Sequence, residues 1–388
     1  MVYIKEFNSP PFLMYRWTKN ILLLLASSAA GYLVPNPSGQ YNVTLTTGPL
    51  IDHTRQDPYS PEPTPRALML SVFQPTECTH TIPVQYMPNK TTEFQGPFLE
   101  QLFNISVNFS PLFLEARLPV CESRAERCSL LENAPILLFS PGYRVNRFYY
   151  NYLASTIASE GFTVITIDHP YDANIITYPD GDTVYTNASI LESPSWDLIP
   201  RAEDASFVID QLSNATAMAE LIPSRGPRPF PVDRVAMFGH SAGGGAAMVA
   251  ASRDSRIRSA VNWDGPILGF LSLSGMSQPA LFMAREDVTY DSWPRAWLQL
   301  EGFKLAIRIA NTTHQSFSDA PTLFRAAGQN LKPFAGLLGT ISPEEMVHLL
   351  TCYTTEWTRW SLKGKANEWL PGTINSCNAS AVLHYEIE

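Results

Sequence analysis

The pentapeptide at 239–243, Gly-His-Ser-Ala-Gly, is the feature that most constrains how this chain folds. An apolar run, 235–238, comes directly before it, and a segment of small residues, 244–251, comes directly after it. This order predicts a strand, a sharp turn and a helix, in which a bulky Cβ two positions from the serine would collide with a neighbouring element. The turn would hold the Ser241 hydroxyl at the carboxyl end of a sheet, within reach of a base. A loop serine without a role is the alternative, since the pattern also occurs by chance.

Apolar strand-like segments alternate with helix-like segments along the rest of the chain. Expected strands are at 67–73, 135–140, 162–167, 257–263, 280–284 and 304–310, and expected helices at 149–160 and 201–212. Strands of this kind joined by helical crossovers predict an α/β protein with a mainly parallel central sheet and helices on both faces. We divide the chain into an N-terminal segment, 1–34, and a single domain, 35–388, with an N-terminal extension and loop insertions.

The N-terminal segment has the features of a secretory signal peptide. Arg16 and Lys19 precede an apolar run at 21–34, and the small residues 26–30 offer a cleavage site. The run is shorter than the roughly 20 residues that cross a bilayer. We therefore expect a cleaved signal and a secreted protein, with an N-terminal membrane anchor as the alternative.

Sequons and cysteines point to the same compartment. Eight Asn-x-Ser/Thr sequons occur where composition alone would give roughly three, and each predicts a surface asparagine if it is used. They are Asn42, Asn89, Asn104, Asn108, Asn187, Asn214, Asn311 and Asn378. Five cysteines fit two disulfides and one odd thiol, and proximity pairs Cys121 with Cys128 and Cys352 with Cys377. None of them has the paired spacing of a zinc site, so we expect neither a metal nor a cofactor.

A serine nucleophile needs a base and an acid that orients the base. His314 follows the last expected strand, where the chain order serine, acid, histidine places the base. The other histidines (His53, His80, His169, His240, His348 and His384) lie in less suitable places. Asp264, after the first strand beyond the serine, and Asp287, after the next strand, are both candidates for the acid. Their surroundings alone favour neither strongly.

Several segments together resemble the platelet-activating factor acetylhydrolase family. They are Phe139-Ser140-Pro141-Gly142-Tyr143 within 135–169, the segment 239–244, Asn262-Trp263-Asp264, and Thr313-His314-Gln315-Ser316-Phe317-Ser318-Asp319. Upstream, 50–58 and 65–69 are similar to fungal members, so that the likeness spans about 48–319. The resemblance implies an α/β-hydrolase fold and favours Asp264 over Asp287 as the acid. It also implies an oxyanion hole made by the backbone N–H groups of Ala242 and Tyr143.

One departure from the family pattern concerns the substrate. Where the family often has His-Gly-Leu, this chain has Pro-Gly-Tyr at 141–143, and proline has no N–H to donate. The departure bears on how a substrate fits around Tyr143.

The resemblance implies a secreted serine esterase that forms an acyl-enzyme on Ser241 and takes short or oxidised sn-2 acyl groups from phospholipids. A polyester (cutinase-like) or small-metabolite hydrolase, an acyl transferase and an inactive binding module are the alternatives; Gly243-Gly244-Gly245 suggests the first of these. The apolar residues of 98–103, with Phe109, Leu112, Phe113 and Leu114, fit transient contact with a lipid surface, or else core packing or a lid. Residues 331–369 form either a lid or a cap on the sheet.

Charge excludes other partners. The net charge is −9 and no run of lysine or arginine occurs, which argues against nucleic acid and against attraction to anionic lipid. The expected partner is the small-molecule ester or phospholipid that the resemblance implies.

Overall fold

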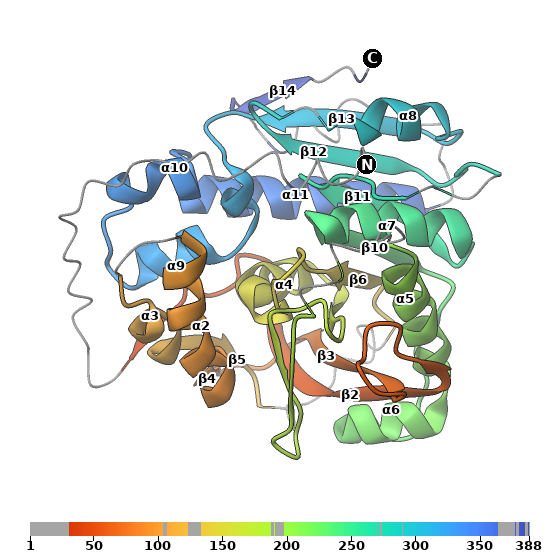
Figure 1. Ribbon diagram of the computed structural model, residues 1–388, viewed down its shortest axis with the longest axis horizontal. Coiled ribbons are helices and arrows are strands. Elements are labelled where there is room, and N and C mark those ends of the chain that lie inside the picture. Colours follow the sequence, from red (N-terminus) through yellow and green to blue (C-terminus); the bar gives the residue numbers. More distant parts are fainter. Residues whose placement is uncertain are drawn as a thin grey trace.

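A nine-stranded sheet forms the centre of the protein, seen in a computed structural model (Figure 1). The structure describes residues 31–103, 107–122, 133–187, 190, 198–269, 271, 274–288, 290–363, 377, 380–384 and 387. The strand order is β14-β13-β12-β11-β10-β6-β7-β3-β2. Strands β13 to β7 in this order are parallel, whereas β14, β3 and β2 are antiparallel to their neighbours. The strands are β2 (Asn42–Gln56), β3 (Pro65–Thr76), β6 (Ile136–Ser140), β7 (Thr163–Asp168), β10 (Val235–His240), β11 (Ile257–Trp263), β12 (Ala280–Arg285), β13 (Lys304–Ile309) and β14 (Val382–His384).

Helices cover both faces of the sheet. One face carries α4 (Asn151–Ser159) and α11 (Pro343–Leu362), and the other carries α5 (Ile199–Leu212), α6 (Ala215–Leu221), α7 (Ala242–Arg253) and α8 (Ser292–Leu298). Strand β10 serves both cores, because Ala236 and Phe238 pack toward α11 while Val235 and Met237 pack toward α7. Burial on both faces explains why apolar residues predominate in the parallel strands, as in β6 and β12. The α/β-hydrolase fold, with its mainly parallel sheet and helices on both faces, is therefore confirmed.

Smaller elements gather around one end of the sheet. Strands β1 (Tyr32–Leu33), β5 (Ala116–Val120) and β4 (Ile82–Gln85) form a three-stranded sheet, and β8 (Ile175–Thr177) pairs with β9 (Thr183–Tyr185). The helices here are α2 (Asn89–Phe103), α3 (Ser110–Leu114), α9 (Ala320–Ala326) and α10 (Ala335–Leu338), with the 3-10 helices η1 (Arg147–Tyr150), η4 (His314–Phe317) and η5 (Lys332–Phe334); η3 (Pro223–Arg225) follows α6. Helices α2, α9 and α10 lie on the left in Figure 1.

Every strand and helix expected from the sequence is present, with bounds that differ by three residues or fewer. The expected helix at 149–160 is η1 continued by α4. Strand β2 was not expected, because polar residues alternate with apolar ones at this edge of the sheet. Helix α11 packs on the sheet, as the cap alternative expects, and α10 lines the cavity described below. Residues 364–369 lie outside the described residues.

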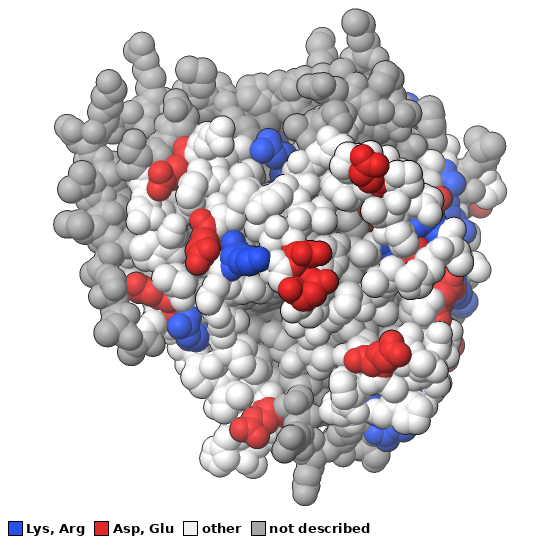
Figure 2. Space-filling view, turned by 60° about the horizontal axis from the view of Figure 1, so that its bottom comes forward, with Lys and Arg blue, Asp and Glu red and all other residues white. Residues whose placement is uncertain are grey.

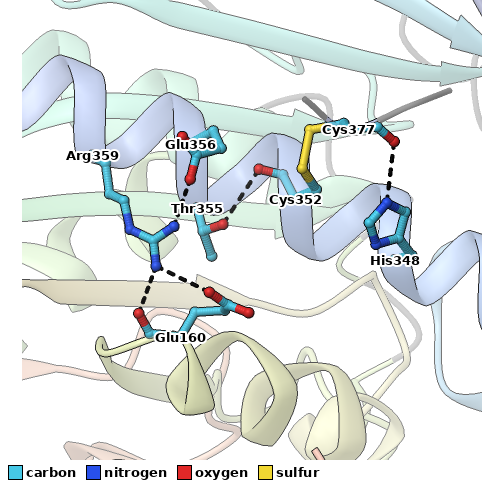
Figure 3. Close-up of a disulfide and its surroundings, with 7 residues drawn as sticks. All are labelled: Glu160, His348, Cys352, Thr355, Glu356, Arg359 and Cys377. Atoms are coloured by element: carbon cyan, nitrogen blue, oxygen red, sulfur yellow. Dashed lines mark hydrogen bonds and ion pairs between the residues drawn. A yellow bond between two sulfur atoms is a disulfide. The ribbon is translucent and has the colours of Figure 1, made fainter. Parts of the chain in front are cut away.

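The described residues form two disulfides, and one of the expected pairings is wrong. Cys352 on α11 is bonded to Cys377, as expected, and His348 Nε2 donates to the Cys377 carbonyl oxygen (Figure 3). Cys121 is bonded to Cys78, however, rather than to Cys128. The end of β5 lies beside β2, with the Cys121 N–H donating to the Val43 carbonyl, and this brings Cys121 to the end of the β2–β3 hairpin. Cys128 lies outside the described residues.

Four of the sequon asparagines are exposed: Asn89, Asn108, Asn214 and Asn311. Asn42 and Asn187 are half-buried, and each donates its side-chain N–H to a carbonyl oxygen, of Cys78 and Tyr59 respectively. A glycan on that nitrogen would leave fewer N–H groups for the bond. Asn104 and Asn378 lie outside the described residues, as does the N-terminal segment as far as residue 30.

Basic and acidic side chains are interspersed on the face shown in Figure 2, with uncharged surface over most of it and a group of both signs at its right edge. This face has no broad basic patch among its described residues. Within the part of the chain that the structure describes, no helix combines the length and apolar character needed to cross a membrane.

Candidate active site

Ser241 occupies the sharp turn between β10 and α7. Its φ is +57°, which is uncommon for a residue other than glycine, and only 7% of the residue is exposed. Its N–H donates to the Trp263 carbonyl at 2.8 Å. A Cβ on Gly243 would lie 1.9 Å from the Ser140 oxygen, and one on Gly239 would lie 2.2 Å from the Gly243 oxygen. Close packing therefore requires the glycines of the motif.

His314 begins η4, just beyond β13, and its imidazole reaches Asp264 at the end of β11. His314 Nδ1 lies 2.6 Å from Asp264 Oδ2. The Asp264 side chain is fully buried, whereas that of His314 is 19% exposed. A carboxylate at Nδ1 holds the proton there and leaves Nε2 free to accept one. His314 and Ser241 line the same cavity, so the structure brings together all three residues that the sequence suggested.

Arg285, at the end of β12, is a second partner of Asp264. Its guanidinium lies 2.8 Å from Asp264 Oδ2, and its backbone N–H donates to Oδ1 at 3.1 Å. Burial tends to raise the pKa of Asp264, but the hydrogen bond and charge of His314, together with the Arg285 charge, outweigh it and hold this pKa well below its usual range. Asp264 therefore stays ionised despite its burial. The sequence did not identify Arg285, because Asp287, two residues later, was the candidate for the acid in this segment.

Asp287 lies in the exposed turn after β12. No hydrogen bond or ion pair joins its side chain to another of the described residues, and it is not among the residues that line the cavity. The geometry thus places Asp264, and not Asp287, beside His314.

None of the other histidines with described side chains lies beside both Ser241 and a carboxylate. His169 is buried, with Nδ1 2.7 Å from Asp204 and Nε2 2.9 Å from Ser140, and burial lowers its pKa. His240 Nδ1 lies 2.8 Å from the Tyr150 hydroxyl, and burial, with the nearby charge of His314, holds its pKa well below the usual value. His53 and His80 are exposed, and His348 bonds to the carbonyl of Cys377. The side chain of His384 is not described.

The expected oxyanion loop follows β6 and lies against Ser241. A Cβ on Gly142 would be 3.4 Å from the Ser241 Cβ, and both Gly142 and Tyr143 line the cavity. Ala242 is the first residue of α7, so its N–H is at the positive end of that helix. The two expected donors, Ala242 and Tyr143, therefore belong to segments on two sides of Ser241. Burial raises the pKa of the Tyr143 hydroxyl to about 12, which keeps it protonated at neutral pH.

The cavity has a volume of about 300 Å³ and is mostly apolar. Helix α2 contributes Phe98, Leu99, Leu102 and Phe103, and α10 contributes Gly336 and Leu337. Phe109, Leu112 and Phe113 are buried in the core, whereas Leu114 is exposed. The apolar segment is therefore mainly cavity wall and core rather than an exposed face.

Two further polar residues, Asn262 and Asp319, fix the backbone segments that carry Asp264 and His314. Asn262 exchanges two hydrogen bonds of 2.8 Å with the backbone of Gly265, which fixes the turn that carries Asp264. Asp319 accepts N–H groups of Tyr152 and Leu153 at the start of α4, at 2.8 and 3.0 Å. It thereby ties the segment after His314 to that helix. In the described residues no group of three or more His, Cys, Asp or Glu side chains is arranged to hold a metal ion.

Comparisons with known proteins agree with this geometry. The model of the family described as platelet-activating factor acetylhydrolase, isoform II, matches residues 27–211 and 230–367. A probable 1-alkyl-2-acetylglycerophosphocholine esterase of Arthroderma benhamiae is 28% identical, over 90% of this chain and 93% of that protein. The platelet-activating factor acetylhydrolase of Bos taurus is 23% identical, over 95% of this chain and 89% of that protein.

Among solved structures, a ferulic acid esterase from Streptomyces cinnamoneus has a TM-score of 0.71 at 22% identity, covering 92% of this chain and 100% of that one. At this identity the likeness shows the fold. The family match covers most of the chain, and the curated relatives are named as esterases or acetylhydrolases. The chain therefore belongs to the platelet-activating factor acetylhydrolase, isoform II, family and is a carboxylic ester hydrolase.

Proposed function

We propose that this protein is a secreted serine esterase that removes short or oxidised sn-2 acyl groups from phospholipids. One observation carries the proposal: His314, whose Nδ1 lies 2.6 Å from Asp264 Oδ2, lines the same cavity as Ser241. In this arrangement Ser241 is the nucleophile, His314 the base and Asp264 the acid.

The reaction has two stages. His314 Nε2 takes the proton as Ser241 Oγ attacks the ester carbonyl, and the same proton then passes to the departing alcohol as the acyl-enzyme forms. A water molecule repeats the attack, with His314 again as base, and releases the carboxylic acid. Asp264 fixes the imidazole and stabilises its charged form. The N–H groups of Ala242 and Tyr143 bind the oxyanion, and each contributes about 3 to 4 kcal/mol to lowering the barrier.

The size and lining of the cavity support a short acyl chain. About 300 Å³ is at the lower end of the range for ligand pockets, and α2 supplies an apolar wall. The relative from Arthroderma benhamiae carries the name of an esterase for a 2-acetyl phospholipid, and acetyl is a short acyl group. The Gly243–Gly245 run has a packing explanation, because a Cβ on Gly245 would lie 2.2 Å from the Pro266 oxygen, and it gives no separate support to a polyester substrate.

A fluorophosphonate probe followed by lipid assays tests the proposal. The wild-type protein should be labelled and Ser241→Ala should not, and labelling of the variant would refute the nucleophile assignment. Phosphatidylcholines of graded sn-2 length should be hydrolysed fastest at the shortest lengths. Activity on p-nitrophenyl esters without activity on any phospholipid would refute the lipid substrate, and transfer of the acyl group to an added alcohol in preference to water would point to an acyl transferase.

Secretion is part of the proposal and rests on the signal-like N-terminal segment, the sequons and the disulfides. N-terminal sequencing of protein from the culture medium should find a start near the small residues 26–30. Retention in the membrane fraction with an intact N-terminus would support the anchor instead. Treatment with a glycosidase should lower the apparent mass, and the exposed asparagines are the expected sites of attachment.

A further inference from the structure

Arg201, on α5, holds the back of the oxyanion loop. Its guanidinium donates to Ser140 Oγ at 3.0 Å, to the Pro141 carbonyl, and to the Gly142 carbonyl at 3.4 Å. The residue is only 2% exposed, and it is not among the residues that line the cavity. One buried cation therefore contacts three consecutive residues of the loop from the side away from the substrate.

Peptide geometry links these contacts to the oxyanion donor. The C=O and N–H of a trans peptide point in opposite directions, and the peptide that carries the Gly142 carbonyl also carries the Tyr143 N–H. Arg201 and the Val145 N–H, at 3.3 Å, both bind the Gly142 oxygen. Fixing that oxygen on one side turns the Tyr143 N–H to the opposite side, and Gly142, Tyr143 and Ser241 line the same cavity. Rotation of this peptide would present a carbonyl oxygen, which repels an oxyanion, in place of a donor.

The guanidinium is itself held in place. Asp172 binds it through both carboxylate oxygens, with Arg201 Nε 2.7 Å from Oδ2, and the Asp172 carbonyl accepts the Arg144 N–H at 3.0 Å. Because Arg201 already donates to Ser140 Oγ, the Ser140 hydroxyl can donate its own hydrogen to His169 Nε2. The planar, five-donor guanidinium fits this set of acceptors, whereas a lysine ammonium would reach only part of it.

We propose that Arg201 is a positioning residue that sets the orientation of the Gly142–Tyr143 peptide and so preorganises the oxyanion hole. This inference rests on the proposed function, because it assumes that Ser241 forms a tetrahedral adduct. Removing one oxyanion donor lowers kcat by about 10²-fold to 10³-fold in serine hydrolases. Arg201→Lys should therefore lower kcat by a similar or somewhat smaller factor and leave KM almost unchanged, since the donor acts mainly in the transition state.

The test compares Arg201→Lys with Arg147→Lys. Arg147 is as deeply buried, is paired with one aspartate, Asp168, and also bonds Ser71, but its described contacts do not include the oxyanion loop. Steady-state kinetics with p-nitrophenyl acetate, the rate of fluorophosphonate labelling and thermal unfolding are measured on both variants. We expect both to lose thermal stability and only Arg201→Lys to lose kcat and labelling rate together.

Three results would overturn the inference. They are a wild-type kcat in folded Arg201→Lys, a change confined to KM in that variant, and an equal loss of kcat in Arg147→Lys. If Arg201→Lys does not fold, Asp172→Asn gives the same comparison, because it keeps the guanidinium but loosens its orientation. A fall in kcat at constant KM supports the inference there, and an unchanged kcat overturns it. Failure of the proposed function looks different, since wild type would then neither hydrolyse the ester nor react with the probe.

Discussion

Replacing Asp264 by asparagine should reverse the hydrogen bonding at His314. In the native protein Asp264 Oδ1 accepts the backbone N–H of Arg285, and Oδ2 accepts from His314 Nδ1. An asparagine oxygen is needed at the Oδ1 position, because the backbone N–H that faces it is fixed. The amide NH₂ then takes the Oδ2 position, while the partly exposed Arg285 side chain can turn to solvent.

The magnitude follows from the imidazole tautomer. An NH₂ group at the Oδ2 position donates to His314 Nδ1 and so places the imidazole proton on Nε2, where it cannot accept the proton of Ser241. In a serine protease the same change lowers kcat by about 10⁴-fold. We expect a loss of about 10³-fold to 10⁴-fold here, or about 4 to 5 kcal/mol of barrier. Asp287→Asn should leave kcat within about twofold, because its exposed side chain has no bond to another described residue.

The assay is hydrolysis of p-nitrophenyl acetate by the two asparagine variants, with circular dichroism to show that each is folded. Titration with a fluorophosphonate gives the concentration of active serine, so that kcat is expressed per competent molecule. Wild-type activity in Asp264→Asn combined with loss in Asp287→Asn would refute the assignment and the reasoning from the tautomer. Loss in both variants would show that the β12 turn also contributes.

Three further changes have expected outcomes. Gly243→Ala should lower kcat at least 100-fold, because the new Cβ would lie 1.9 Å from the Ser140 carbonyl oxygen and would displace the turn that carries Ser241. Gly226→Ala is the control: its Cβ would have nothing within 4 Å, so only the unfolding midpoint should fall. Equal activity of the two variants would contradict this. Replacing both Cys352 and Cys377 by serine should lower the free energy of unfolding by about 3.5 kcal/mol, because the disulfide closes a loop with a sequence separation of 25. Urea denaturation measures this change, and an unchanged midpoint would contradict the prediction. The depressed pKa of Asp264 stabilises the folded state. This stability is complete above the unfolded-state pKa of about 3.9 and is lost as pH falls through the folded-state pKa. The difference in Tm between wild type and Asp264→Asn should therefore shrink below about pH 4, and a constant difference would contradict the prediction.

The buried parallel strands were predictable because most of them are apolar segments, as β6 and β12 show. Strand β2 was not, since its polar residues fit an edge strand and a loop equally well. The bond between Cys78 and Cys121 depends on a hairpin end meeting β5, which spacing along the chain does not reveal.

At the candidate site, too, some residues could be identified from the sequence and others could not. The Gly-His-Ser-Ala-Gly motif identified Ser241 and chain order identified His314, because each directly follows a segment that was expected to be a strand. Arg285 and Arg201 were missed because their roles depend on which carboxylate or carbonyl lies opposite them in space. Arginines near such a site become interpretable only when the acceptors of all their N–H groups are known.

The contact between Asp319 and the start of α4 has a consequence for how activity is lost. The proposed base, His314, comes from the part of the chain beyond β13, whereas α4 lies between β6 and β7, near the first strands of the sheet. Arg359 of α11 makes a second link, to Glu160 at the end of α4 (Figure 3). The two ends of one short helix are therefore bound to two separate C-terminal segments. These links couple α4 to both C-terminal segments, so neither should unfold alone. The loss of esterase activity in denaturant should therefore coincide with the global unfolding transition.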